Sequence, residues 1–162
     1  AHIANIRSHY EQHRDDMKEN YEKHSNAFNF TYGDYTVVIP QTPTDIIDEG
    51  RNMHHCVGNY TQNVIDNRTY IIFIRHKDTP DKCYITCEVY TDGRIGQYFL
   101  AYDKYISSDE DMAFKRAFAE HLAKNWWKEG EGTLPLILGG NSSGVDYYKK
   151  VVKPLDKRKV LC

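Results

Sequence analysis

An Asp-Gly turn between two stretches of β-strand character constrains the fold of this chain more than any other feature. Residues 82–90 alternate in character, which places Cys83, Ile85, Cys87 and Val89 on one face and Tyr84, Thr86, Glu88 and Tyr90 on the other. Thr91-Asp92-Gly93-Arg94 follows, and Asp-Gly is typical of a tight hairpin turn. Residues 95–102 form the returning strand. With the Ile- and Phe-rich strand 70–75, this hairpin predicts an antiparallel sheet.

Helices are expected around this sheet. Ser108 and the acidic residues after it begin a long helix over 109–127, whose apolar stripe faces the strands. Residues 3–25 carry apolar side chains at helical spacing and are expected to form one amphipathic helix. It is packed on its own domain, or it is an arm cut from a larger protein or a dimerising helix. The fold class is therefore α+β: an antiparallel sheet with a long covering helix and an N-terminal helix.

Shorter elements are expected between the N-terminal helix and strand 70–75. Residues 35–39 form a strand that Pro40 ends. A helix over 42–50 has Thr42 as its cap and is closed by Gly50. Residues 59–67 form another short helix.

The 162 residues are enough for one domain with a core of its own. We expect an N-terminal helical arm over 1–30, an α+β core over 31–128, and a linker with a basic C-terminal helix or tail over 129–162. The formal net charge of −2 excludes a global attraction to nucleic acid or anionic membranes. The tail is locally basic and is either a solvated end or a contact for RNA or DNA, through Lys149, Lys150, Lys157 and Arg158.

Nothing in the sequence predicts a membrane or a secretory pathway. The chain has neither a signal peptide at its start nor an apolar run long enough to span a bilayer. It begins at Ala1 without a methionine, which suggests a fragment or a trimmed product. We expect a cytoplasmic location with the four cysteines reduced, and the oligomeric state stays open.

The stretch from Met53 to Tyr60 holds the first candidate site. His55 could activate the thiol of Cys56, because an imidazolium or a helix N-terminus lowers a thiol pKa. The alternative, which we favour, is a buried structural cysteine, because no second group in the sequence orients His55 as a triad requires. No metal is expected: there is no CxxC pair, and Cys83 and Cys87 lie about 13 Å apart on an extended strand.

The second candidate site uses one polar residue from each core strand: Arg75, Glu88 and Gln97. A carboxylate inside a β-core is costly unless it is paired, and Arg75 is the expected partner of Glu88. Together with His55 and Tyr60 these residues are expected to surround one cleft, with Cys56 lining it or behind it. In a catalytic interpretation His55, Tyr60 and Glu88 react, while Arg75, Gln97 and Cys56 bind the ligand.

The order of these features resembles the PcfJ-like family. Glu49-Gly50, then His55-Cys56-Val57-Gly58-Asn59-Tyr60, is similar to that family's EG and L-H-C-V-G-x-Y signature. The blocks 70–75, 86–89 and 95–97 follow in the family's order, so the resemblance covers roughly residues 30–127. It implies an association with conjugative plasmids, integrative elements or phages. Relatives continue after Gln97 with glycine and asparagine, whereas this chain reads Tyr98-Phe99-Leu100-Ala101-Tyr102-Asp103.

Two functions remain open at this stage. One is an accessory binding module of a mobile element, which engages a nucleic acid or a protein partner through the polar cleft and the basic tail. The other is a small enzyme acting on a nucleotide-like substrate. A weaker resemblance to ADP-ribosyltransferases implies NAD for that second function, with His55, Tyr60 or Tyr70, and Glu88 in the family's order. We favour the binding module, because no complete catalytic constellation can be assembled.

Overall fold

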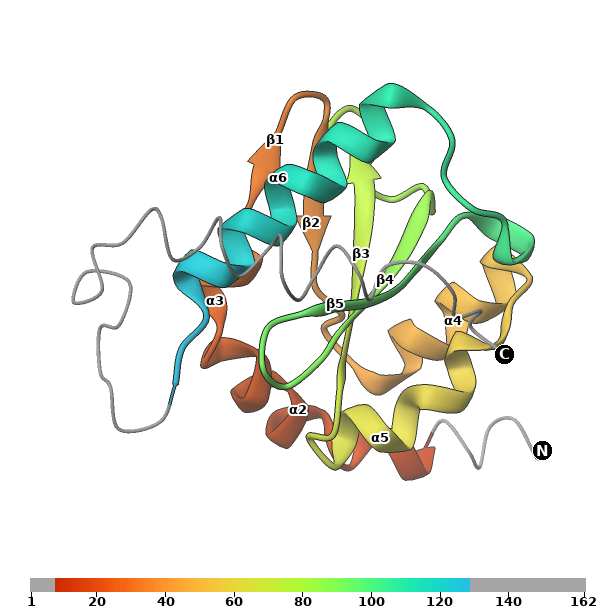
Figure 1. Cartoon of the computed structure of the whole chain (residues 1–162). Coiled ribbons are helices and arrows are strands. Elements are labelled where there is room, and N and C mark those ends of the chain that lie inside the picture. The colour runs from red at the N-terminus through yellow and green to blue at the C-terminus, as the bar shows by residue number, and fades with distance from the viewer. Residues whose placement is uncertain (1–7, 129–162) are drawn as a thin grey trace.

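The computed structural model describes residues 8–128 and contains one antiparallel sheet of five strands. Each strand pairs with the next along the chain, so the order is β1-β2-β3-β4-β5 (Figure 1). The strands are β1 (Thr31–Tyr32), β2 (Tyr35–Val38), β3 (Tyr70–His76), β4 (Ile85–Val89) and β5 (Ile95–Phe99). The α+β prediction is confirmed, and β1 is a strand that the sequence analysis did not predict.

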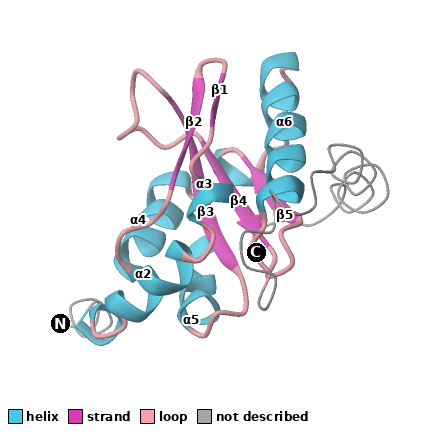
Figure 2. Cartoon of the chain, turned by 90° about the vertical axis from the view of Figure 1, so that its left-hand side faces the viewer, coloured by secondary structure: helices cyan, strands magenta, loops and turns pink. Residues whose placement is uncertain are grey.

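Helices cover both sides of the sheet. The strands lie between α6 on one side and α4 on the other when the molecule is turned by 90° (Figure 2). The α-helices are α2 (Arg14–Glu22), α3 (Ser25–Phe28), α4 (Pro43–Met53), α5 (Thr61–Ile65) and α6 (Asp109–Asn125), and the 3-10 helices are η1 (Cys56–Tyr60) and η2 (Ala101–Asp103).

The predicted hairpin and covering helix both form, and local chemistry explains each. Gly93 adopts φ +90°, a left-handed conformation that glycine tolerates best, and its N–H donates to Tyr90 O at 2.9 Å. Ser108 Oγ accepts the Asp111 N–H at 3.0 Å and so caps α6. The Asp111 carboxylate then accepts hydrogen bonds from Tyr35 at 2.6 Å and Tyr84 at 2.8 Å, which fix the start of α6 on the sheet.

The prediction of one helix over 3–25 is wrong within the described residues. The chain turns at residues 12–13 and again at 23–24, where the His24 ring packs against Trp126 instead of continuing the helix. Tyr21 is buried, and its hydroxyl donates to Ile71 O at 2.7 Å and accepts from Ile71 N at 3.0 Å. The Tyr21 hydroxyl thereby forms hydrogen bonds with the backbone of Ile71 in β3, where β2 no longer pairs with it. The domain boundary at residue 30 stays a prediction, and the predicted C-terminal linker and helix lie outside the described residues.

Gly50 does not close its helix, because α4 continues to Met53 and ends at His54, which has φ 55°. Glycine is needed at position 50 for close packing. A Cβ there would lie 2.9 Å from Gly58 N and 3.1 Å from His55 O, so η1 rests directly on α4. The helix predicted over 59–67 is α5, and η1 precedes it.

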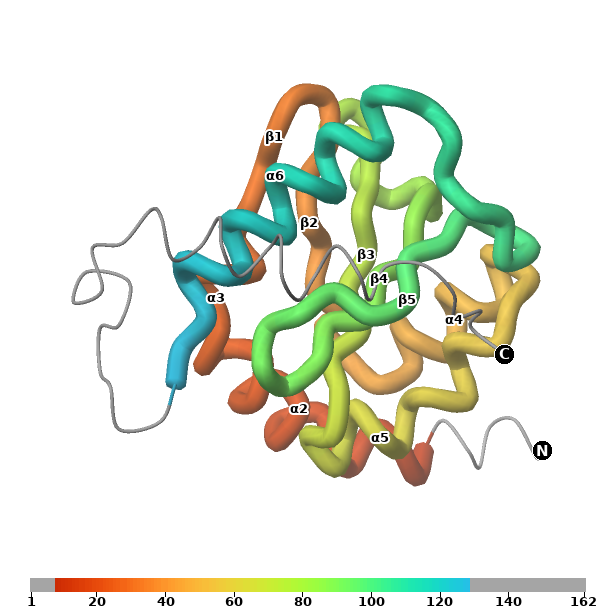
Figure 3. The backbone as a smooth tube through the Cα atoms, viewed as in Figure 1, coloured from red at the N-terminus to blue at the C-terminus, as the bar shows by residue number. Residues whose placement is uncertain are grey.

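The ends of the hairpin also differ from the prediction. Strand β4 begins only at Ile85, so the alternation does not extend to the two residues before it. Cys83 contacts Glu49 of α4, while Tyr84 contacts Asp111 of α6, which is the reverse of the predicted faces. Strand β5 ends at Phe99, and η2 follows beside the end of α4 (Figure 3).

Two residues of η2 have unusual backbone conformations. Tyr102 and Asp103 have φ 59° and 56°, values that glycine and asparagine adopt most readily. The exposed Tyr102 ring stacks on His54 with ring centroids 4.6 Å apart. The loop that departs from the family pattern is therefore held against the residue that ends α4.

Candidate functional site

The carboxylate of Glu49 is the centre of a polar network between α4 and the sheet. Glu49 is only 1% exposed. Its Oε1 accepts a hydrogen bond from Arg75 Nη2 at 2.7 Å and one from Cys83 Sγ at 3.1 Å, and its Oε2 accepts one from Thr86 Oγ1 at 2.7 Å. A buried charge is stable only when it is paired and hydrogen-bonded, and Glu49 meets both conditions.

His55 is joined to this network through Thr86. Val57 N–H donates to His55 Nδ1 at 3.4 Å, so Nδ1 carries no proton and Nε2 is the protonated nitrogen. His55 Nε2 donates to Thr86 Oγ1 at 3.1 Å, and the Thr86 hydroxyl donates onward to Glu49. Burial lowers the pKa of His55, against the opposing effect of the Asp103 and Glu49 carboxylates, which favours the neutral ring at pH 7.

A second polar group surrounds Glu88 on β4. Glu88 Oε2 accepts from Thr69 Oγ1 at 2.7 Å, and Oε1 accepts from Gln97 Nε2 at 3.2 Å. Gln97 Nε2 also donates to the Tyr60 hydroxyl at 2.7 Å. Glu88 and Thr86 point to the same side of β4, with their Cα atoms about 7 Å apart, so the two groups are neighbours on one sheet face.

The structure therefore brings the candidate residues together in two linked groups. Tyr60, Glu88 and Gln97 form one group, while His55 and Arg75 belong to the network of Glu49. The predicted pairing of Arg75 with Glu88 is wrong. Glu88 lies opposite Ile71 in the β3–β4 register, four residues from Arg75, and Arg75 forms its ion pair with Glu49.

Sequence reasoning missed Glu49, Thr69 and Thr86 as members of these groups. For Glu49 a signal was present. It lies at helical spacing among the buried residues of α4, which also include Ile46, Gly50 and Met53. A carboxylate on the buried stripe of an amphipathic helix indicates a partner across the interface. No such signal exists for the threonines, which are common in strands.

A pocket of about 240 Å³ opens beside the Arg75 end of the network. Glu49, Arg75 and Cys83 line it together with Asp45, Asp48 and Asp81, so carboxylates outnumber the single guanidinium. His55, Tyr60 and Glu88 do not line this pocket. Within residues 8–128, no group of three or more His, Cys, Asp or Glu side chains is arranged to hold a metal ion.

The cysteines show no activated thiol in the described part of the chain. The structural role of Cys56 and the reduced state of the cysteines as a whole stay predictions. Cys83 and Cys87 are free. Burial, reinforced by Glu49, raises the pKa of the Cys83 thiol to about 11, and burial raises that of Cys87 further. The tail residues Lys149, Lys150, Lys157 and Arg158 lie outside the described residues.

None of the helices within residues 8–128 combines the length and the apolar character that crossing a bilayer requires.

The fold and the polar face define a class: a small α+β domain whose antiparallel sheet carries a buried, hydrogen-bonded polar network beneath a His-Cys-containing turn. The family model described as PcfJ-like protein matches residues 1–100, and the chain belongs to this family. The match includes the N-terminal segment that the sequence analysis had placed outside the family core.

One curated protein is similar to part of this chain. The uncharacterized protein Lin1253/Lin1744 of Listeria innocua serovar 6a is 38% identical over 69 residues. That stretch is 41% of this chain and 15% of the relative, so the chain matches only a small part of that longer protein. No solved structure matches the chain.

Proposed function

We propose that this chain is a nucleic-acid-binding accessory domain of a mobile genetic element rather than an enzyme. The observation that supports it is that the candidate catalytic side chains are already bonded within the protein. Both nitrogens of His55 have partners, and so do both carboxylate oxygens of Glu88. A general base or a nucleophile must be directed at a substrate, and these hydrogen bonds hold both side chains toward the protein instead.

The NAD-using alternative is poorly supported by the surroundings of Glu88. Its side chain is 6% exposed, and its Oε1 lies 2.9 Å from the place where a Cβ on Gly96 would be. The small exposed area gives a ribose hydroxyl little access to this carboxylate. The network is therefore better suited to holding α4 and η1 on the sheet than to chemistry.

Charge decides which surface suits a nucleic acid. The pocket at Arg75 repels phosphate, because Asp45, Asp48 and Asp81 line it with Glu49. The basic tail has the opposite character, with Lys149, Lys150, Lys157 and Arg158 close in sequence. We therefore assign the phosphate contacts to the tail. Such contacts make the binding salt-sensitive, and the net charge of −2 keeps it weak.

Neutralising the tail tests this proposal. We expect replacement of all four tail cations by glutamine to weaken binding of a labelled single-stranded oligonucleotide at least tenfold in low salt, measured by fluorescence anisotropy. The slope of log K against log salt should decrease by about 3, because each cation on a single strand contributes about 0.7. A matched control replaces the exposed lysines Lys18, Lys77, Lys82 and Lys104 by glutamine. Equal weakening by the two variants would contradict a tail-specific contact.

A further inference from the structure

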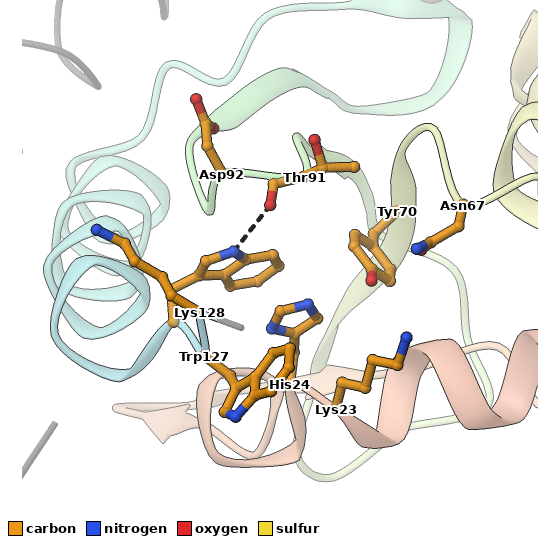
Figure 4. A pocket seen from close by; sticks show the side chains of 9 residues that line it. Lys23, His24, Asn67, Tyr70, Thr91, Asp92, Trp127 and Lys128 are labelled. Carbon is orange, nitrogen blue, oxygen red and sulfur yellow. Dashed lines mark hydrogen bonds between the residues drawn. The ribbon is translucent and has the colours of Figure 1, made fainter. Parts of the chain in front are cut away.

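A second pocket lies on a different part of the molecule, and its chemistry is unlike that of the acidic one. Its volume is about 400 Å³, within the roughly 300–1,000 Å³ typical of small-ligand sites. Four separate segments line it: the α2–α3 turn, Asn67 with the start of β3, the β4–β5 turn and the residues that follow α6 (Figure 4). Of the lining residues, only Tyr70 was a candidate from the sequence, as the alternative to Tyr60 in the ADP-ribosyltransferase resemblance.

Two aromatic layers form one wall of this pocket. His24 stacks on Trp126 with ring centroids 3.7 Å apart and an interplanar angle of 9°. Trp126 is fixed in turn, because its indole N–H donates to Thr91 O at 2.9 Å. Trp127 meets His24 edge-on, at 6.3 Å and 66°, and no described ring stacks on its face. The half-exposed Trp127 ring is thus available to stack with a flat ligand.

The charge of the pocket is positive. Lys23 and Lys128 are both exposed at its rim, and neither forms an ion pair with a residue of the described part. The one carboxylate in the lining, Asp92, is neutralised by Arg94, whose Nε lies 2.6 Å from Asp92 Oδ2. Two lysines beside an aromatic face are typical of sites that hold a phosphate and a base together.

The wall also contains a polar atom without a partner. His24 is 6% exposed, and its Nδ1 is buried with no hydrogen bond to any described residue. Burial, with Lys23 nearby, lowers the pKa of His24 to about 4, so the ring is neutral at pH 7. This unpaired atom is closed to solvent, so the ring serves as a rigid part of the wall and its Nδ1 takes no part in the proposed contact.

We infer that this pocket binds a nucleotide unit, with the base stacked on Trp127 and the phosphate between Lys23 and Lys128. This inference deepens the proposed function, because it places a nucleotide contact on the folded domain. Lys128 also leads along the chain into the segment that carries the basic tail. The nucleotide can be free or part of a single strand, and the two sources share this chemistry.

The two tryptophans of the chain, Trp126 and Trp127, both line this pocket, so intrinsic tryptophan fluorescence reports on it alone. We expect AMP to quench this fluorescence saturably in the full chain. Adenosine and ribose 5-phosphate should each bind at least tenfold more weakly, because each lacks one half of the recognised group. Absence of quenching by AMP and by an eight-residue oligo-dA would overturn the inference. So would phenyl phosphate binding as tightly as AMP, because it would show a site for phosphorylated phenols instead.

Single substitutions test which side chains contact AMP. Trp127→Leu should weaken AMP binding at least tenfold by calorimetry, and Lys23→Gln about threefold. Lys18→Gln, on the preceding helix α2, should leave AMP binding unchanged. Equal weakening by Lys18→Gln and Lys23→Gln would refute the pocket. Tighter binding of oligo-dA than of AMP identifies a strand as the source, and the reverse order a free nucleotide. If the tail variant loses strand binding while AMP binds to neither protein, the proposed function stands and this inference fails.

Discussion

Replacing Glu49 by alanine is expected to lower the free energy of unfolding by about 3 kcal/mol, because breaking a buried ion pair leaves an uncompensated charge. Arg75 Nη2, 2.7 Å from Glu49 Oε1, would lose its only ion-pair partner among the described residues. The buried hydroxyl of Thr86 would lose its acceptor as well. The Arg75 side chain is 12% exposed, so water relieves part of the penalty and the loss falls at the lower end of the range for buried pairs.

Urea unfolding followed by circular dichroism measures this loss. Glu19→Ala provides the matched control, since Glu19 is exposed on α2 and its removal should change stability by less than about 0.5 kcal/mol. Adding Arg75→Ala to Glu49→Ala should cost much less than Arg75→Ala alone, because the two residues are coupled. A Glu49→Ala protein as stable as the wild type would show that the network does not hold α4 on the sheet.

Gly50→Ala should destabilise the protein by about 2 kcal/mol, although alanine is the better helix former by about 1 kcal/mol. The new Cβ would lie 2.9 Å from Gly58 N and 3.2 Å from Val57 Cγ1. Backbone cannot yield as a flexible side chain does, so η1 would be pushed away from α4. His55, which precedes η1, would then be displaced from Thr86.

Gly58→Ala is the control for this substitution, because its Cβ would lie 3.6 Å from Ile47 Cα, an ordinary contact. We expect Gly58→Ala to be close to neutral in the same unfolding experiment, with any gain arising from the unfolded chain. If the two glycine variants were equally stable, the close approach of η1 to α4 would not explain the glycine at position 50.

Local signals account for the parts of the fold that the sequence predicted well. Asp92-Gly93 specifies its turn through the backbone freedom of glycine, and Ser108 begins α6 through a single side-chain acceptor. Neither depends on distant residues. The helix α4 was expected for the same kind of reason: Pro43 stands at its start, and Asp45 accepts the Thr42 N–H at 3.2 Å.

Features that depend on packing were beyond a local analysis. Gly50 is an end signal in isolation, yet here it is the point where another segment approaches the helix. The strand predicted over 82–90 began three residues too early, because only its pairing with β3 shows that β4 begins at Ile85.

The candidate site was predicted in part. Tyr60, Glu88 and Gln97 are joined by hydrogen bonds: Glu88 and Gln97 lie on adjacent strands, and Tyr60 reaches Gln97 from η1. The partner of Arg75 was assigned wrongly, because Glu49 of the helix α4 lies next to Arg75, whereas Glu88 lies opposite Ile71. The pocket at Trp127 was not foreseen, since its walls come from four segments that are distant in sequence.

Thermal shift on the full chain and on Glu88→Gln tests most directly whether this protein binds rather than catalyses. We expect a short single-stranded oligonucleotide to raise the melting temperature of both proteins equally, and added salt to remove the effect. Any stabilisation by NAD should persist in Glu88→Gln and disappear in Trp127→Leu. Stabilisation by NAD that is lost in Glu88→Gln but kept in Trp127→Leu would contradict the account and identify Glu88 as part of an NAD site.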